Sequence, residues 1–123
     1  MYIEIDFNSD EALYIQLRNQ IILGIATAQI KNGEALPSVR ALADNIGINM
    51  HTVNKAYALL KDDGFVRVDR RRGVVVAIDF DKIRTMATVE SYLRPVLAAA
   101  IAKGISREEM KGIVDNIYDE WTI

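Results

Sequence analysis

The side chains that could bind a partner are concentrated between residues 38 and 73, and they are hydrogen-bonding or cationic groups. This segment contains Asn49-Met50-His51-Thr52-Val53-Asn54-Lys55 near its middle and Arg70-Arg71-Arg72 near its end. Asparagine can pair with adenine through two hydrogen bonds, methionine can contact a thymine methyl group, and lysine or arginine binds phosphate. These residue types predict contact with DNA.

Positive charge is concentrated in the same segment, although the whole chain has a formal net charge of −2. Residues 37–73 contain seven Lys or Arg against four Asp or Glu, whereas residues 1–36 contain two against five and residues 79–123 six against eight. The local surplus sets the field that a phosphate backbone meets. The charge distribution is therefore compatible with DNA binding.

The residue types argue against an enzyme. The chain has no cysteine and one histidine, His51, so we expect neither a Ser-His-Asp or Cys-His set nor a metal site built from thiolates or several histidines. No glycine-rich phosphate loop is visible. We expect no catalytic activity, no metal and no cofactor.

The spacing of Ala43, Gly47 and Val53 predicts how the polar segment is held. These offsets are typical of two short helices that meet at a tight turn and pack closely at a steep angle. Ser38 and Asn49 are natural N-caps for them, and Gly47 can take the left-handed conformation that ends the first helix. We therefore expect a helix-turn-helix with helices at about 39–46 and 50–63.

Another helix is expected before this pair, at about 12–29. Leu13, Leu17, Ile21, Ile25 and Ala28 recur at near-helical spacing. Polar residues from Asn8 to Glu11 give its start signal, and Lys31-Asn32-Gly33 its stop signal.

The helix at 50–63 divides its side chains between two faces. Val53, Ala56, Tyr57 and Leu60 form the inward stripe, with the Tyr57 hydroxyl satisfied at the rim, and His51, Asn54, Lys55 and Ala58 face outward. Recognition helices enter the major groove with their first turn leading. Arg40 suits a phosphate, although an ion pair with Asp44 is the alternative. The predicted contacts in this region are Ser38, Arg40, Asn49, Met50, His51, Thr52, Asn54 and Lys55.

A β-hairpin with a basic tip is expected next. The runs 65–68 and 74–78 are rich in β-branched residues, and Asp69-Arg70-Arg71-Arg72-Gly73 separates them. A hairpin after a helix-turn-helix is typical of a wing that slides along the duplex. This adds Arg70, Arg71, Arg72 and Gly73 to the predicted DNA contacts.

A family resemblance is carried by Leu36-Pro37-Ser38-Val39-Arg40-x-Leu42-Ala43, Ile48-Asn49-x-x-Thr52-Val53-x-x-Ala56-Tyr57-x-x-Leu60 and Gly64-Phe65-Val66. The sequence resembles the GntR family of bacterial repressors over residues 12–78, and the short tail with Tyr14-x-Gln16 resembles its YtrA-type branch. The resemblance implies a dimeric repressor in which Arg40, residues 49–54 and Gly73 touch operator DNA. The family wing usually has Gly-x-Gly-Thr-Phe, whereas this chain has Arg72-Gly73-Val74-Val75-Val76.

Residues 79–123 are expected to form two short amphipathic helices, at about 82–103 and 107–121. Pro95 should kink or divide the first, and Ser106 with Glu109 forms a capping box at the start of the second. Segments this short cannot form a core of their own, so a partner copy should cover their apolar faces. The predicted dimer contacts are Val89, Leu93, Leu97, Met110, Ile113, Val114, Ile117 and Trp121.

The expected fold is mainly α with a small β-hairpin: a winged helix-turn-helix at 1–78 followed by a helical dimerisation tail at 79–123. We expect a cytoplasmic transcription regulator, a repressor, that binds a palindromic operator as a homodimer. A small-molecule effector of unknown identity is left open, and no membrane contact is expected because the apolar runs are too short. The alternative is a winged-helix module that binds proteins instead of DNA.

Overall fold

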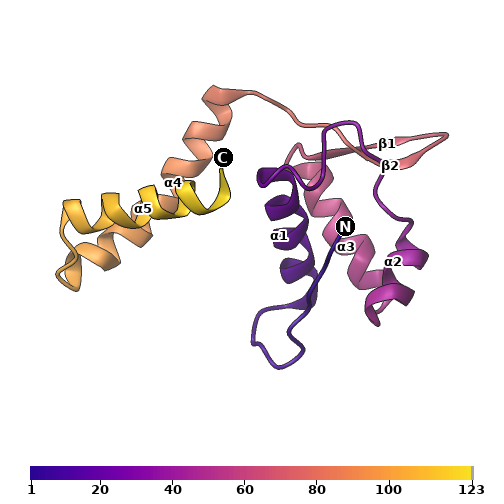
Figure 1. Ribbon diagram of the computed structural model, residues 1–123, viewed down its shortest axis with the longest axis horizontal. Helices are drawn as coiled ribbons and strands as arrows, with labels where there is room; N and C mark the ends of the chain where they lie inside the picture. Colours follow the sequence, from indigo (N-terminus) through magenta and orange to yellow (C-terminus); the bar gives the residue numbers. More distant parts are fainter. Residues whose placement is uncertain (123) are drawn as a thin grey trace. The chain divides into compact units, whose positions relative to one another are not determined.

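The computed structural model describes residues 1–122 and confirms a mainly helical fold with one small hairpin (Figure 1). The elements are α1 (Leu13–Ala26), α2 (Val39–Ile46), α3 (Met50–Asp62), β1 (Val66–Asp69), β2 (Gly73–Val76), α4 (Lys82–Ala102) and α5 (Arg107–Trp121). The chain divides into two compact units. Met1–Asp79 form the first, and the second begins at Phe80.

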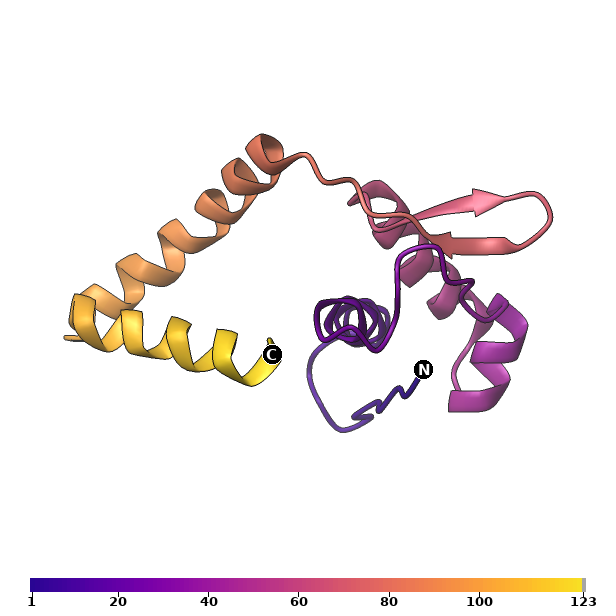
Figure 2. The same cartoon turned by 45° about the horizontal axis from the view of Figure 1, so that its top comes forward.

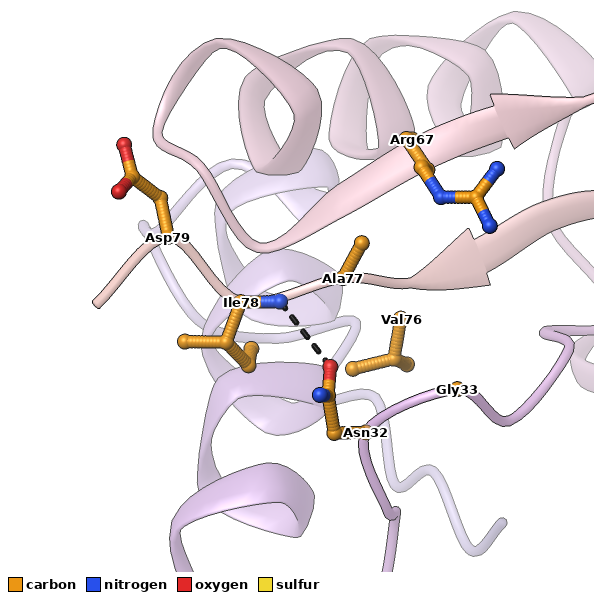
Figure 3. A pocket seen from close by; sticks show the side chains of 7 residues that line it. All are labelled: Asn32, Gly33, Arg67, Val76, Ala77, Ile78 and Asp79. Atoms are coloured by element: carbon orange, nitrogen blue, oxygen red, sulfur yellow. Dashed lines mark hydrogen bonds between the residues drawn. The ribbon is translucent and has the colours of Figure 1, made fainter.

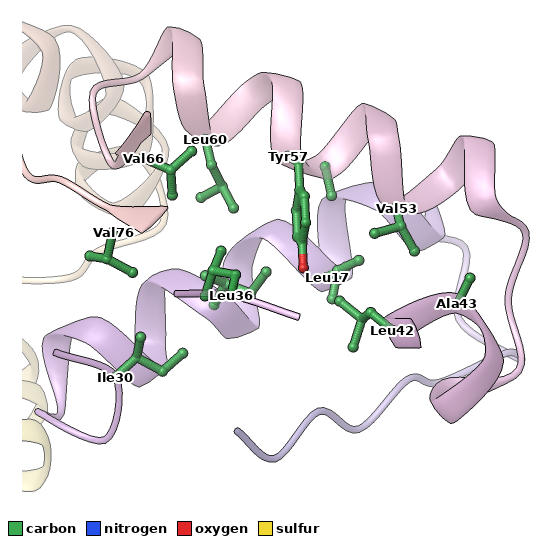
Figure 4. Close-up of a cluster of buried hydrophobic side chains, with 12 residues drawn as sticks. Leu17, Ile30, Leu36, Leu42, Ala43, Val53, Tyr57, Leu60, Val66 and Val76 are labelled. Carbon is green, nitrogen blue, oxygen red and sulfur yellow. The ribbon is translucent and has the colours of Figure 1, made fainter. Parts of the chain in front are cut away.

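The core of the first unit lies where α1, α2 and the hairpin pack against α3 (Figure 4). The predicted inward stripe of α3, formed by Val53, Ala56, Tyr57 and Leu60, is buried. The Tyr57 hydroxyl donates a hydrogen bond of 2.7 Å to the Pro37 carbonyl oxygen, as expected for a buried phenol. Burial also raises the pKa of Tyr57. The core therefore fixes which face of α3 is left exposed.

Both caps predicted for the helix pair are present. The Ser38 hydroxyl accepts a hydrogen bond from the Ala41 N–H at 3.1 Å, and the Asn49 side chain accepts one from the His51 N–H at 2.7 Å. Gly47 has φ 72° and ends α2 in the left-handed conformation. With Ala43 and Val53 buried, the tight turn between α2 and α3 is built as predicted.

The predicted bounds of the first helix are wrong at its end. Helix α1 stops at Ala26, and Ala28 has φ 62°, a left-handed conformation that a non-glycine residue rarely adopts. The chain turns here because Ile30 folds back into the core, where it is 2% exposed. The expected start signals do not cap α1 either, since its N-cap residue is Ala12.

The turn after α1 brings Ile30 against Gly24. A Cβ atom on Gly24 would lie 2.7 Å from Cδ1 and 3.0 Å from Cγ1 of Ile30. We expect Gly24→Ala to lower the free energy of unfolding by about 1–2 kcal/mol, because overpacking outweighs the better helix propensity of alanine. Chemical denaturation measures this change. Ile30→Val shortens the opposing side chain, so the two costs should be less than additive, and a Gly24→Ala protein as stable as wild type would contradict the packing.

Two glutamines of α1 hold the N-terminal segment. The Gln16 side chain accepts a hydrogen bond from the Asp6 N–H at 2.9 Å and donates to the Asp6 carbonyl at 3.0 Å. One turn later, the Gln20 side chain makes the same pair of bonds with the backbone of Glu4. Gln16 also donates to the Glu11 carbonyl at 2.9 Å and is buried. These bonds fix the first turn of α1.

The hairpin gains a third extended segment that the sequence pattern did not predict. Strands β1 and β2 pair antiparallel, with Val66 opposite Val76 and Asp69 opposite Gly73. On the other side of β2, Leu36 N–H donates to the Val74 carbonyl at 2.8 Å and Gly33 N–H to the Val76 carbonyl at 2.7 Å. The segment 33–36 thus joins the wing to the loop between α1 and α2.

The second unit contains α4 and α5, which diverge from their connection as an open V (Figure 2). Helix α4 is continuous through Pro95, so the proline does not divide it. The capping box of α5 is present, with Ser106 and Glu109 exchanging hydrogen bonds of 3.1 and 3.0 Å, and the Ser106 N–H lowers the pKa of Glu109. Neither helix has a buried side chain. Among residues 1–122, no helix is long and apolar enough to cross a membrane.

Candidate nucleic-acid interface

The outward face of α3 exposes the polar residues predicted to contact DNA. Asn49, His51, Asn54, Lys55 and Ala58 are exposed, Met50 is 41% exposed, and Thr52 is half-buried. The Asn49 side-chain oxygen is already used as the helix cap. The side chains of the first two turns therefore form one accessible strip that opposes the buried stripe of the same helix.

The start of α2 contains Ser38 and Arg40, the other two residues of the helix-turn-helix that are predicted to contact DNA. The Ser38 hydroxyl caps α2, and Arg40 is exposed. Within the described part of the chain, Arg40 forms no ion pair with Asp44, which was the alternative considered for it. Its guanidinium is therefore available to an anion.

The three wing arginines are not equivalent. The Asp69 carboxylate accepts hydrogen bonds from the N–H groups of Arg71 and Arg72, at 2.8 and 3.0 Å, and so closes the tip. The Arg72 guanidinium donates to the Gly33 carbonyl at 2.6 Å. No side-chain partner is found for Arg70 or Arg71 in residues 1–122. Arg70 and Arg71 thus carry the available charge, whereas Arg72 attaches the wing to segment 33–36.

The tip of the wing should respond to acid. Backbone N–H groups of Arg71 and Arg72, and then the charge of Arg67, lower the pKa of Asp69 from its ordinary value of 3.8. Because the folded pKa is the lower one, the carboxylate stabilises the tip above the unfolded pKa, and this contribution is lost as pH falls through the folded pKa. The NMR shifts of the Arg71 and Arg72 amides should titrate with a midpoint below 3.8. Asp69→Asn should abolish this titration, and a midpoint at or above the ordinary value would contradict the hydrogen bonds.

A shallow hollow of about 520 Å³ lies beside the wing, lined by Asn32, Gly33, Arg67, Val76, Ala77, Ile78 and Asp79 (Figure 3). Across it, the Asn32 side-chain oxygen accepts a hydrogen bond of 3.1 Å from the Ile78 N–H. This bond is a second tie between the wing and the loop after α1.

Sequence reasoning missed two residues that act on the predicted contacts. The Gly33 carbonyl oxygen accepts a hydrogen bond from the Arg72 guanidinium. The Tyr14 ring lies under the ammonium group of Lys55, with 4.6 Å between Nζ and the ring centroid. Both contacts join segments distant in sequence. The Tyr14-x-Gln16 motif was the available signal for the second contact, but the motif does not say what the tyrosine touches.

The sequence matches the bacterial regulatory proteins of the gntR family over residues 10–76. It is 30% identical over 111 residues to the HTH-type transcriptional repressor YtrA of Bacillus subtilis, covering 88% of this chain and 85% of that protein. It is 27% identical over 119 residues to the HTH-type transcriptional regulator Rv1152 of Mycobacterium tuberculosis, covering 97% and 96%. The relatives thus include a YtrA-type regulator, as the sequence motifs predicted.

Solved structures share the fold. YtrA from Sulfolobus acidocaldarius, a GntR-family transcription factor, is 41% identical with a TM-score of 0.62, over 74% of this chain and 96% of that one. A transcriptional antiterminator from Listeria monocytogenes has a TM-score of 0.84 at 24% identity, over 95% and 90%. The AraR DNA-binding domain, solved with operator ORX1, has a TM-score of 0.53 at 23% identity, over 63% and 99%. The last two show likeness of fold alone. The winged helix-turn-helix predicted from the sequence is confirmed, and the chain belongs to the GntR family of bacterial transcription regulators.

Proposed function

We propose that this regulator is a homodimeric repressor that binds a palindromic operator through α3 and the wing. The main support is the division of α3 into a buried apolar stripe and an exposed polar strip at its N-terminal end. In a helix-turn-helix this end of the recognition helix meets base edges. The AraR DNA-binding domain, which shares the fold, was solved with an operator, and this supports the proposal that the chain binds DNA.

The predicted contacts take different roles in the proposal. Asn54 and Met50 read base edges, and His51 and Thr52 contact bases or flanking phosphates. Arg40 and Lys55 bind the DNA backbone, as do Arg70, Arg71 and the Gly73 backbone from the wing. Ser38, Asn49 and Arg72 are engaged within the protein, so we propose that they act by orienting α2, α3 and the wing.

The second unit is proposed to pair two copies. The large apolar side chains of residues 80–122 are exposed or half-buried; Leu93 is 42% exposed and Ile117 is 37% exposed. Because neither α4 nor α5 has a buried side chain, we propose a second copy of the chain as the partner that covers this apolar stripe, with the same stripe used on both chains. The remaining predicted dimer contacts are Val89, Leu97, Met110, Ile113, Val114 and Trp121. One helix-turn-helix reads few base pairs, so a dimer also supplies the second half-site needed for specificity.

Two-fold symmetry would place the two recognition helices one or more helical turns of DNA apart, at a spacing of about 34 Å or its multiples. Occupation of such a site at a promoter would block transcription. We expect the protein in the cytoplasm, with the chromosome it regulates. Small-molecule control of release stays a prediction.

The decisive experiment is selection of bound fragments from random duplex DNA, followed by sequencing and by measurement of the protein mass in solution. The proposal predicts an inverted repeat and the mass of a dimer. Enrichment of a single unrepeated site, or a monomer that binds its selected site at full affinity, would refute the dimeric mode. Absence of duplex binding even at low salt, where phosphate contacts are strongest, would refute DNA binding itself.

A further inference from the structure

The ammonium group of Lys55 lies over an aromatic ring. Its Nζ atom is 4.6 Å from the centroid of the Tyr14 ring, within the distance at which a cation is attracted to the face of an aromatic ring. Lys55 belongs to the exposed strip of α3, and Tyr14 belongs to the first turn of α1. In residues 1–122 no carboxylate forms an ion pair with Lys55. The ring is thus placed to set the position of this charge.

The ring itself is firmly held. Tyr14 is half-buried and packs against the core of the first unit. Two residues later, Gln16 is buried and makes three hydrogen bonds to the backbone of Asp6 and Glu11. Helix α1 also packs directly on α3. Tyr14 therefore forms a fixed platform beside a side chain that would otherwise have a large rotamer entropy.

We infer that Tyr14 is a positioning residue for DNA binding: its ring holds the Lys55 ammonium where a phosphate of the duplex is bound. This inference rests on the proposed function. A contact with the ring face leaves N–H donors of the ammonium free, since this group has three. The lysine then loses less conformational freedom when it meets the phosphate, and preorganisation of this kind increases affinity. Tyr14 would thereby extend the functional surface from the helix-turn-helix to α1 without touching a base.

A double-mutant cycle tests the inference with the full chain. The probe is a mixed-sequence duplex of about 30 base pairs, and its binding is measured by fluorescence anisotropy at several salt concentrations. Tyr14→Leu, which keeps an apolar side chain against the core, should weaken binding about two- to five-fold. Tyr14→Phe should bind like wild type because it keeps the ring. Lys55→Met should weaken binding and reduce the salt slope by about one per subunit. Adding Tyr14→Leu to Lys55→Met should then cause no further loss.

Proton NMR of the free protein gives a readout that a purely structural role of Tyr14 would not produce. The ring should shift the ε-methylene protons of Lys55 upfield in the wild type and in Tyr14→Phe, and this shift should be absent in Tyr14→Leu. Thermal melting of each variant separates loss of fold from loss of position.

Three results would overturn the inference: no upfield shift in the wild type, a Tyr14→Leu loss of equal size in the presence and absence of Lys55, or a Tyr14→Phe protein as weak as Tyr14→Leu. The last would mean that the hydroxyl group, not the ring, is used. Failure of the wild type to bind any duplex would refute the proposed function, whereas duplex binding with an additive cycle would refute only the role of Tyr14.

Discussion

Leu93→Glu is expected to convert the protein to a monomer and to weaken operator binding by about 100-fold or more. Leu93 lies on the apolar stripe of α4 and is 42% exposed in the single chain, so the substitution removes no core contact within its own unit. In the dimer it would place a charge from each copy in an apolar interface. A monomer binds one half-site and loses the gain in affinity that comes from linking two binding sites, which is roughly 10²–10⁴-fold. Analytical ultracentrifugation and operator titration measure the two effects.

Ser91→Glu is the matched control for this variant. Ser91 is exposed on the same helix, and two residues of helical rotation place it away from the stripe. It introduces the same charge, and glutamate suits a helix as well as leucine does. The control should remain dimeric and bind normally. A dimeric Leu93→Glu protein would show that the stripe is not the interface between copies.

Asn54→Ala should weaken specific binding strongly while leaving non-specific binding nearly unchanged. Asn54 is exposed in the second turn of α3, where its amide can donate to and accept from one adenine. Loss of such a bidentate contact costs about 1–3 kcal/mol in each half-site. Because the side chain is uncharged, the affinity for mixed duplex and its salt dependence should stay close to wild type.

Asn45→Ala provides the comparison, since Asn45 is an exposed asparagine in the last turn of α2 and is not a predicted contact. It should retain operator affinity. A repeat of the random-duplex selection with Asn54→Ala should relax base preference at one symmetric pair of positions. If Asn54→Ala lost operator and mixed-duplex affinity equally, Asn54 would be a backbone contact and not a base-reading residue.

Local chemistry was sufficient to predict α2 and α3. A hydroxyl or amide side chain before each helix, a glycine after α2, and small or β-branched residues at the turn act over a few residues. Ser38, Gly47 and Asn49 therefore behave as their types suggest. The same holds for Ser106 and Glu109, whose capping box lies within four residues.

Contacts between distant segments were not predictable in this way. Helix α1 ends before Ala28 because the chain turns there to bury Ile30 in the core. The helical spacing of apolar residues includes Ala28 and therefore does not show that the turn is preferred to a longer helix. Segment 33–36 is too short for an alternating pattern, and its partners on β2 lie 38 to 43 residues further along the chain. The bond from Arg72 to Gly33 and the position of Lys55 over Tyr14 likewise depend on packing. For the candidate site, the sequence identified the polar residues but not which of their side chains form hydrogen bonds within the protein.

The pairing of segment 33–36 with β2 sets a rule for exchanging wings between related regulators. A chimaera that imports only residues 66–76 would pair the incoming Arg72 and β2 with the recipient's own segment 33–36, whose backbone has not been matched to them. The exchanged module has to include residues 32–36 as well, because the two pieces form one sheet although α2 and α3 separate them in the chain.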